Sequence, residues 1–309
     1  MIDGFPRPFG RLRLGGAPHL PLQALADELR SLTGRDVQPV PADSVPAPSG
    51  STMAQTRQAA ARVSALRAQV LSGEIDCAVH AYPDLPSLPD ARLAIAATPA
   101  RDDPRDVLVA DLPFNELPRG AMVGTTSARR LAMLRKLRTD LSYHLIDADA
   151  QAMLGMFTDG HLAAVVCARP DLSYRQAQTG HVFGIEHMLP DPGQGALALE
   201  CLAGRCDVVD TVHVLHDRRT GNAVTAERAL LAAVNPDERF VIGGYAADDG
   251  HLVSLTAAVL SADGQHLVRT FGTCTSADAA DLGRLLGADL QTQTVSWNAS
   301  SVSGTREST

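Results

Sequence analysis

One short stretch of the chain combines residue types that can bind an anion. Residues 124–130 read Gly-Thr-Thr-Ser-Ala-Arg-Arg, after a short β-prone run. Apolar residues then fall at Leu131, Leu134 and Leu137, a spacing that predicts a helix with one buried face. Ser127 stands where an N-cap is expected, because its hydroxyl can accept a backbone N–H of the first helical turn.

Two arginines, Arg129 and Arg130, begin this predicted helix. The first turn of a helix carries a partial positive charge, so both side chains oppose the local dipole. An anionic ligand would resolve the conflict, since backbone N–H groups, the hydroxyls of Thr126 and Ser127 and the guanidinium groups can all bind a carboxylate. A solvated basic face with an ordinary cap is the alternative, and the pattern alone leaves both open.

The composition is that of a globular protein with a net negative charge. The 309 residues include 27 Lys and Arg against 35 Asp and Glu, giving a net charge of −8, with 45% hydrophobic and only 4% aromatic residues. A nucleic-acid or anionic-membrane surface would need a basic face. The sequence start has no signal-peptide pattern and no apolar run is long enough for a membrane span. We therefore predict a cytoplasmic protein without nucleic-acid or membrane partners.

The cysteines and histidines do not predict a metal site. Five scattered cysteines favour reduced thiols over a disulfide framework. Cys77 and Cys167 lie in apolar strand-like runs and are predicted core residues. His213 and His216 are three residues apart, without a nearby acid or thiol to complete a ligand set. We predict no metal.

Strand-like and helix-like runs alternate along the first two thirds of the chain. The predicted strands are residues 11–14, 37–40, 75–79, 93–97, 107–110, 121–123, 142–146, 163–168 and 182–186. The predicted helices are residues 22–32, 52–71, 128–138, 149–158 and 171–179. This alternation predicts an α/β fold with doubly wound, mostly parallel sheets. A break near residues 98–106 suggests two such domains facing each other across a cleft.

The last third predicts a smaller α+β domain. Residues 194–203 form a strand or helix, residues 208–217 and 223–234 are helical, and strands 240–246, 252–260 and 267–273 form a meander before a helix at 276–287. The predicted domains are residues 11–98 with 194–217, residues 102–190, and residues 218–292. Residues 1–10 and 293–309 are predicted disordered tails.

Six motifs, in order and with matching spacing, carry a resemblance to a known family. They are Asp76–His80 with Asp84 after it, Asp103–Asp106, Gly124–Arg130, Asp191–Ala196, Thr225–Leu230 and Ile242–Ala246. With them, residues 11 to 290 resemble hydroxymethylbilane synthase, also called porphobilinogen deaminase. The resemblance implies three domains, the first two like type II periplasmic binding proteins. It also implies an enzyme that links porphobilinogen units head to tail, with release of ammonia, on a cysteine-bound dipyrromethane cofactor.

The resemblance assigns candidate roles to particular residues. Asp84 matches the family's aspartate that handles protons at the pyrrole nitrogens, and its alternative role is a turn residue that caps backbone N–H groups. Substrate carboxylates are expected on Thr126, Ser127, Arg129 and Arg130. Gln194 is a further candidate for substrate binding, and its alternative role is to hold the interdomain turn. His19 is a candidate ligand contact in a loop that binds anions in the family. Arg105, with Asp103 and Asp106, is predicted to form a structural ion pair, and His80 a packed strand-end histidine.

Several positions depart from the family pattern. Glu238 stands where the family has its cofactor cysteine, and a carboxylate cannot form the thioether. Both arginines of an anion-binding segment are absent from residues 147–153, and Pro83 replaces a lysine. We therefore predict that the dipyrromethane cofactor is absent.

These departures favour a repurposed enzyme without dipyrromethane. It would act on a small carboxylate-bearing amine or pyrrole by elimination, addition or condensation, with Asp84 as acid, base or cation stabiliser. A non-catalytic protein that binds a carboxylated metabolite is one alternative. A genuine hydroxymethylbilane synthase that holds its cofactor non-covalently or elsewhere is another. The family resemblance suggests a monomer.

Overall fold

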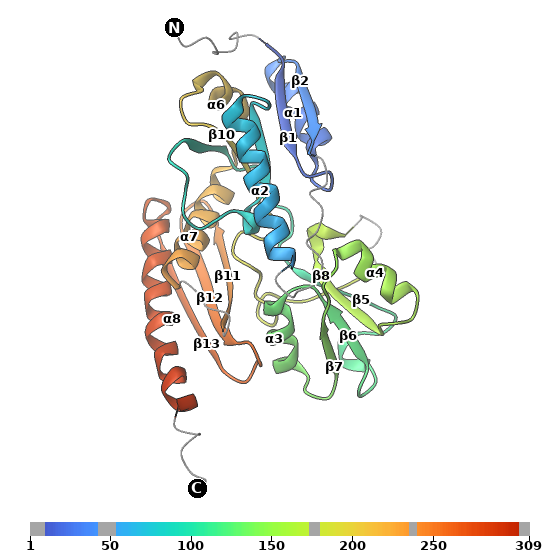
Figure 1. Ribbon diagram of the computed structural model, residues 1–309. Coiled ribbons are helices and arrows are strands. Elements are labelled where there is room, and N and C mark those ends of the chain that lie inside the picture. The colour runs from blue at the N-terminus through green and yellow to red at the C-terminus, as the bar shows by residue number, and fades with distance from the viewer. Residues whose placement is uncertain (1–9, 43–53, 173–179, 235–239, 303–309) are drawn as a thin grey trace. The chain divides into compact units, whose positions relative to one another are not determined.

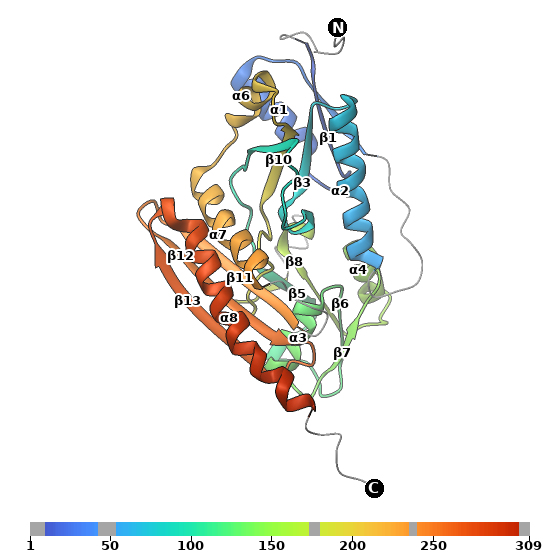
Figure 2. The same ribbon diagram turned by 60° about the vertical axis from the view of Figure 1, so that its left-hand side comes forward.

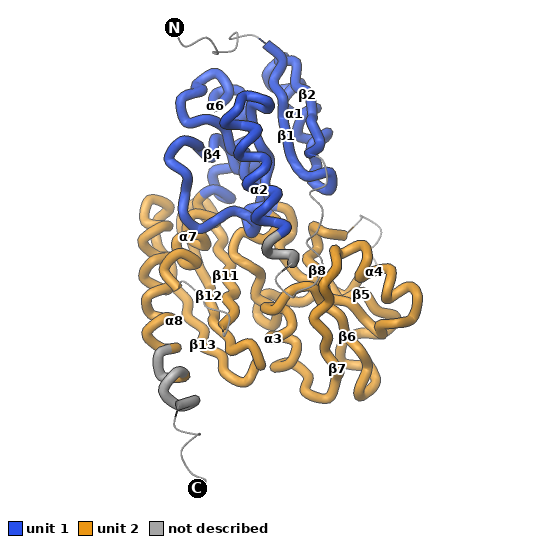
Figure 3. Tube along the Cα trace, in the orientation of Figure 1, with its two compact units in different colours: residues 1–101, 196–221 blue, residues 102–195, 222–309 orange. Residues whose placement is uncertain are grey.

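The computed structural model describes residues 10–42, 54–172, 180–234 and 240–302. The chain divides into two compact units, which Figure 3 colours separately. Unit 1 contains residues 1–101 and 196–221, and unit 2 contains residues 102–195 and 222–309. Each unit therefore combines segments that are distant in the sequence.

Unit 1 is built on a five-stranded sheet with the strand order β2-β1-β3-β10-β4. Its strands are β1 (Leu12–Gly16), β2 (Val37–Pro41), β3 (Cys77–Ala81), β4 (Leu93–Ala97) and β10 (Leu197–Leu202). β1 pairs in parallel with β2 and β3, whereas β10 runs antiparallel to β3 and β4. Its helices are α1 (Leu22–Thr33), α2 (Ala54–Ser72) and α6 (Cys206–His213), with a short 3-10 turn η1 (Tyr82–Asp84) after β3.

Unit 2 contains a second sheet of the same kind, with the order β7-β6-β8-β5-β9. Its strands are β5 (Asp106–Ala110), β6 (Met122–Thr125), β7 (Ser142–Leu145), β8 (Ala164–Ala168) and β9 (His181–Val182). β6 pairs in parallel with β7 and β8, and β5 runs antiparallel to β8 and β9. Helices α3 (Ala128–Leu137) and α4 (Ala150–Thr158) accompany this sheet, with the 3-10 turns η2 (Phe114–Glu116) and η3 (Arg169–Asp171).

Unit 2 also contains an antiparallel sheet of three strands in sequence order. These are β11 (Phe240–Asp248), β12 (Val253–Ser261) and β13 (Leu267–Cys274), with α7 (Arg218–Val234), η4 (Ser276–Asp278) and α8 (Ala279–Val302). Leu282, Leu286 and Leu290 of α8 join the core that this sheet buries, and Figures 1 and 2 both show α8 lying along the sheet. Gly283 lets α8 approach α7, because a Cβ there would collide with the backbone carbonyl of Ala226.

The predicted α/β class is confirmed, with two doubly wound, mostly parallel sheets and a smaller α+β part. Each sheet differs from a purely parallel one by a single reversed strand, β10 or β5, which the alternation of strands and helices could not reveal. β9 has only two residues, and α8 continues to Val302, well beyond the predicted helix end at residue 287. The predicted helix at 171–179 falls mostly outside the described residues, and the domain boundaries stay a prediction. Among the described residues, no helix is both long enough and apolar enough to cross a bilayer.

Candidate functional site

The predicted cap of α3 is present and joins two strands of unit 2. Ser127 is the N-cap, with its hydroxyl oxygen accepting the backbone N–H of Arg130 at 3.4 Å. β6 ends at Thr125, two residues before it, and the Thr125 hydroxyl donates to the carbonyl of Val166 in β8 at 3.0 Å. The end of β6 is therefore bonded to β8 just before the chain enters α3.

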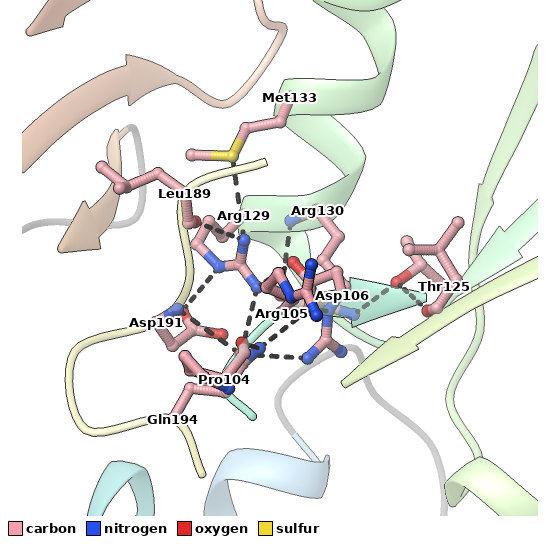
Figure 4. Close-up of polar contacts among 12 residues, drawn as sticks. Pro104, Arg105, Asp106, Thr125, Arg129, Arg130, Met133, Leu189, Asp191 and Gln194 are labelled. Atoms are coloured by element: carbon pink, nitrogen blue, oxygen red, sulfur yellow. Dashed lines mark hydrogen bonds and ion pairs between the residues drawn. The ribbon is translucent and has the colours of Figure 1, made fainter. Parts of the chain in front are cut away.

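Both arginines of α3 point into the unit and bind one buried aspartate (Figure 4). Arg129 Nη2 lies 2.9 Å from Asp106 Oδ2, and Arg130 Nε lies 2.8 Å from Asp106 Oδ1. Arg129 also donates to the carbonyl of Leu189 at 2.6 Å and pairs with Asp191 at 3.0 Å. Asp106 is completely buried. Burial raises its pKa, but the two guanidinium groups outweigh burial, so that the pKa lies below its ordinary value.

Gln194 completes this buried cluster from the turn between Gly193 and Gly195. Its side-chain oxygen accepts from Arg129 and Arg130 at 3.2 Å each, and its amide nitrogen donates to Asp106 at 2.9 Å. Each of these contacts lies within unit 2. The structure thus gives Gln194 the role of holding the two arginines and the aspartate in place; its predicted contact with substrate stays a prediction.

The two arginines at the start of α3 predicted an anionic ligand or a solvated basic face, and the structure places the buried carboxylate of Asp106 against both of them. Binding of a ligand carboxylate here stays a prediction. Two acids, Asp103 and Asp106, were predicted to pair with Arg105. Only Asp103 does so, at 2.6 Å, and the predicted pairing with Asp106 is wrong. The two arginines also differ from each other. Every guanidinium nitrogen of Arg129 lies within bonding distance of a neighbour. In the part of the chain that the structure describes, Nη1 of Arg130 and the hydroxyl of Thr126 have no hydrogen-bond partner, so these are the groups that remain available to a ligand carboxylate.

A second buried acid joins three of the motifs that carry the family resemblance. Glu227 of α7 accepts the backbone N–H of Gly193 and that of Ala246, both at 2.6 Å. It is completely buried. Through Glu227, these motifs therefore contribute to the packing of unit 2.

In unit 1, Asp84 lies in the 3-10 turn that follows β3. Its side chain is partly buried, and it makes no hydrogen bond or ion pair with any described residue. Burial raises its pKa, and the charges of Arg62, His19 and His80 oppose this shift without cancelling it. Unit 1 thus brings together two predicted site residues, Asp84 and His19. A carboxyl with a raised pKa in a partly buried position can exchange protons more readily near neutral pH.

A buried ionic network supports the strand that precedes Asp84. Arg67 binds Glu200 through two nitrogens at 2.9 and 2.8 Å, and His80 Nε2 lies 3.3 Å from the same carboxylate. His80 is 2% exposed, as expected for a packed strand-end histidine. The sequence analysis did not identify Arg62, Arg67 or Glu200, because each is a charged residue without a local motif.

Cys77 and Cys167 are buried core residues, as predicted. His213 and His216 stack at 5.0 Å between ring centroids, and each contacts the backbone near β4. Among the described residues, no group of three His, Cys, Asp or Glu side chains has the arrangement of a metal site.

Two α/β units with polar groups after their strands define the general class of protein, and sequence comparison identifies the family. Residues 45–210 match the family described as "Porphobilinogen deaminase, dipyromethane cofactor binding domain". A porphobilinogen deaminase of Acidothermus cellulolyticus is 43% identical over 238 residues, covering 74% of this chain and 71% of the relative. The chain belongs to the porphobilinogen deaminase family, an enzyme family.

Other matches are shorter or weaker. A porphobilinogen deaminase of Nocardia farcinica is 44% identical over 200 residues, covering 62% of this chain but only 58% of the relative's length. Among solved structures, the VFT2 domain of BvgS from Bordetella pertussis matches with a TM-score of 0.40 and 19% identity, covering 66% of this chain and 85% of that domain.

The prediction that the dipyrromethane cofactor is absent is wrong. It relied on Glu238, Pro83 and the missing arginines of residues 147–153, whereas the match over residues 45–210 is to the cofactor-binding domain of the family. Glu238 itself lies outside the described residues. The residues that are described fit part of such a group, because Arg130 Nη1 and the hydroxyls of Thr126 and Ser127 are donors suited to its carboxylates.

The positions of the described cysteines bear on where the dipyrromethane cofactor could be attached. Cys77, Cys167 and Cys201 are buried, and Cys206 is exposed on α6 of unit 1. Cys274 ends β13 opposite Val253, whereas Phe240, which follows residues 235–239, lies opposite Ser261 at the other end of β12. Val253 and Ser261, the two ends of β12, are eight residues apart in the sequence, which corresponds to about 26 Å along an extended strand. Cys274 and the start of β11 therefore lie at opposite ends of this sheet.

Proposed function

We propose that this protein is a genuine hydroxymethylbilane synthase, which joins porphobilinogen units and releases ammonia. The observation that carries the proposal is Asp84, a partly buried carboxyl without a hydrogen-bond partner among the described residues, in a chain of the porphobilinogen deaminase family. This was the least favoured alternative in the sequence analysis. The family match supports it over a repurposed enzyme, for which the structure offers no separate observation.

The proposed reaction breaks one bond and forms another at each step. The C–N bond of the protonated aminomethyl group breaks, and its electron pair leaves with ammonia, so that a cation remains on the methylene carbon. The free α-carbon of a second pyrrole then bonds to this methylene carbon and loses its ring proton. The cation formed when ammonia leaves is shared with the pyrrole nitrogen, so a carboxylate beside that N–H stabilises it electrostatically. We assign this task, and the associated proton transfer, to Asp84. The bound dipyrromethane group supplies the pyrrole carbon at which the chain starts.

The carboxylates of substrate and cofactor need donors. In unit 2 we assign Arg130 and the hydroxyls of Thr126 and Ser127 to them, with Arg129 and Gln194 holding Arg130 in position. In unit 1 we assign His19, whose charge already acts on Asp84. Charge-assisted hydrogen bonds of this kind fix orientation as well as adding affinity.

Porphobilinogen consumption and ammonia release by the purified full chain test the proposal, with intact-mass measurement before and after incubation. We expect turnover, and we expect Asp84→Asn to lower kcat by about a hundredfold or more without changing thermal stability. Asp210→Asn, an exposed aspartate on α6, is the matched control and should behave as the wild type. Absence of both turnover and any mass increase would contradict the proposal and return the binding-protein interpretation.

A further inference from the structure

A nine-residue pattern occurs twice in the chain, once in each unit. Residues 77–85 read Cys-Ala-Val-His-Ala-Tyr-Pro-Asp-Leu, and residues 164–172 read Ala-Val-Val-Cys-Ala-Arg-Pro-Asp-Leu. The first covers β3 and η1, and the second covers β8 and η3. Asp84 and Asp171 occupy the same position in the two copies.

The backbone of the two copies agrees closely. Ala81 has φ −71° and ψ 133°, and Ala168 has φ −69° and ψ 141°. In each copy the leucine after the aspartate is buried and donates its N–H at 3.1 Å to the first residue of the 3-10 turn. The similarity is therefore one of conformation as well as of sequence.

The two copies also have the same position in their sheets. β3 and β8 are each the third of five strands. Each has a parallel neighbour on one side, β1 or β6, and an antiparallel neighbour on the other, β10 or β5. In each unit the aspartate thus follows the carboxyl end of the central strand, which is where ligands bind in sheets of this type.

In unit 2 this sheet edge also carries the carboxylate-binding donors. β6 and β8 are parallel and adjacent, with Thr125 opposite Val166, so the residues after β6 and after β8 emerge at the same edge. Asp171 is exposed there. Its charge reaches Arg130: burial lowers the pKa of Arg130, but Asp106, Asp191 and Asp171 together raise it. An exposed carboxylate and a set of anion donors therefore lie at the same edge of this sheet.

We propose that Asp171 is a second pyrrole-binding carboxylate, which accepts the ring N–H of a pyrrole whose acidic side chain is held by Arg130, Thr126 and Ser127. This inference rests on the proposed function. A pyrrole with acetate and propionate groups presents one N–H donor and separate anionic acceptors, and the edge of unit 2 presents the complementary set. Asp84 performs the corresponding task in unit 1, and Asp171 binds without a covalent step.

Two unreactive ligands test this assignment directly. One is a pyrrole with the acetate and propionate groups of porphobilinogen but no aminomethyl group, and the other is the matching furan, whose ring oxygen cannot donate. We expect the wild type to prefer the pyrrole and Asp171→Asn to reduce that preference about tenfold or more, measured as dissociation constants by titration calorimetry. Asp159→Asn is the matched control, because Asp159 is exposed after α4, before β8 begins.

Two results would overturn the inference. An unchanged preference would mean that Asp171 does not contact the ring, and equal weakening of both ligands would mean that it only supports Arg130. Porphobilinogen turnover by the wild type separates this outcome from failure of the proposed function. An active wild type with an unaffected Asp171→Asn variant contradicts the inference alone, whereas an inactive wild type that binds neither ligand contradicts both.

Discussion

The buried aspartate beneath α3 provides the sharpest test of the structure. Replacing Asp106 by Asn keeps the size of the side chain but removes the negative charge that faces Arg129 and Arg130. One of its two oxygens becomes an N–H donor that faces another donor, and the two guanidinium groups remain buried. Asp191, 3.0 Å from Arg129 and 34% exposed, is then the remaining acid bound to either arginine in the described residues.

The expected loss follows from this geometry. Removing one partner of a buried ion pair costs about 3–5 kcal/mol, since the other charge stays uncompensated. For a unit of this size each kcal/mol lowers Tm by about 2–4 °C, so Asp106→Asn should unfold about 6–20 °C earlier. Asp281→Asn is the control. It removes an exposed pair with Arg284, with side chains 72% and 61% exposed, which is worth at most about 1 kcal/mol.

The pH dependence gives a second readout of the same variant. The pKa of Asp106 is lowered in the folded state, so its contribution to stability is complete above 3.8, the ordinary value, and is lost as pH falls through the folded pKa. The stability difference between wild type and variant should therefore be constant near neutral pH and shrink below about 3.8. Thermal and urea unfolding followed by circular dichroism measure both effects. A difference below about 1 kcal/mol at pH 7 would refute the reasoning.

Four other variants probe the same unit, and Gly204→Ala in unit 1 serves as a control. Arg129→Lys should lower the free energy of unfolding by about 2 kcal/mol or more, because one ammonium cannot replace contacts to Leu189, Asp106 and Gln194. Arg130→Lys should instead weaken carboxylate binding, measured by calorimetry, more than it lowers the melting temperature. If Arg129→Lys and Arg130→Lys had the same effects on binding and on melting, the assignment of a structural role to Arg129 and a binding role to Arg130 would be contradicted. Gly195→Ala should cost about 1–3 kcal/mol, since Gly195 has φ +81° and a Cβ would lie 2.8 Å from a backbone carbonyl. Gly204→Ala, with open space around it, should be nearly neutral in the same melting experiment. Glu227→Gln should lower Tm by several degrees, because an amide can accept only one of the two backbone N–H groups that the carboxylate binds.

Much of the fold could be predicted because its elements have strong local signals. The strand at Leu93–Ala97 was predicted with its exact bounds, and α1 (Leu22–Thr33) ends one residue beyond the predicted helix at 22–32, where Gly34 has φ +67°. The reversed strands β10 and β5 could not be predicted, because strand direction depends on pairing partners that are distant in the sequence. β10, for example, pairs with β3 more than a hundred residues before it.

The candidate site was only partly readable from the sequence for a related reason. Adjacent arginines after a strand-turn pattern predicted an anion, and an anion is present, but it comes from Asp106 in another strand. The sequence does not distinguish Arg129 from Arg130. The three-dimensional contacts do, because each guanidinium nitrogen of Arg129 lies within bonding distance of a neighbour, whereas Nη1 of Arg130 has no hydrogen-bond partner among the described residues. A repeated Pro-Asp-Leu at residues 83–85 and 170–172 was visible in the sequence, and comparing the two halves of the chain would have found Asp171.

The positions of the family motifs in the structure explain why the prediction of an absent dipyrromethane cofactor was wrong. The family motifs around Gln194, Glu227 and Ala246 meet in buried hydrogen bonds, so each constrains the packing of several elements at once. The prediction that the cofactor is absent relied on departures at Glu238, Pro83 and residues 147–153, and it gave them more weight than these buried, mutually dependent positions. Because those positions hold the strand ends of unit 2 in place, the groups at that edge, Arg130 and Asp171 above all, are where the chemistry of this chain should be tested.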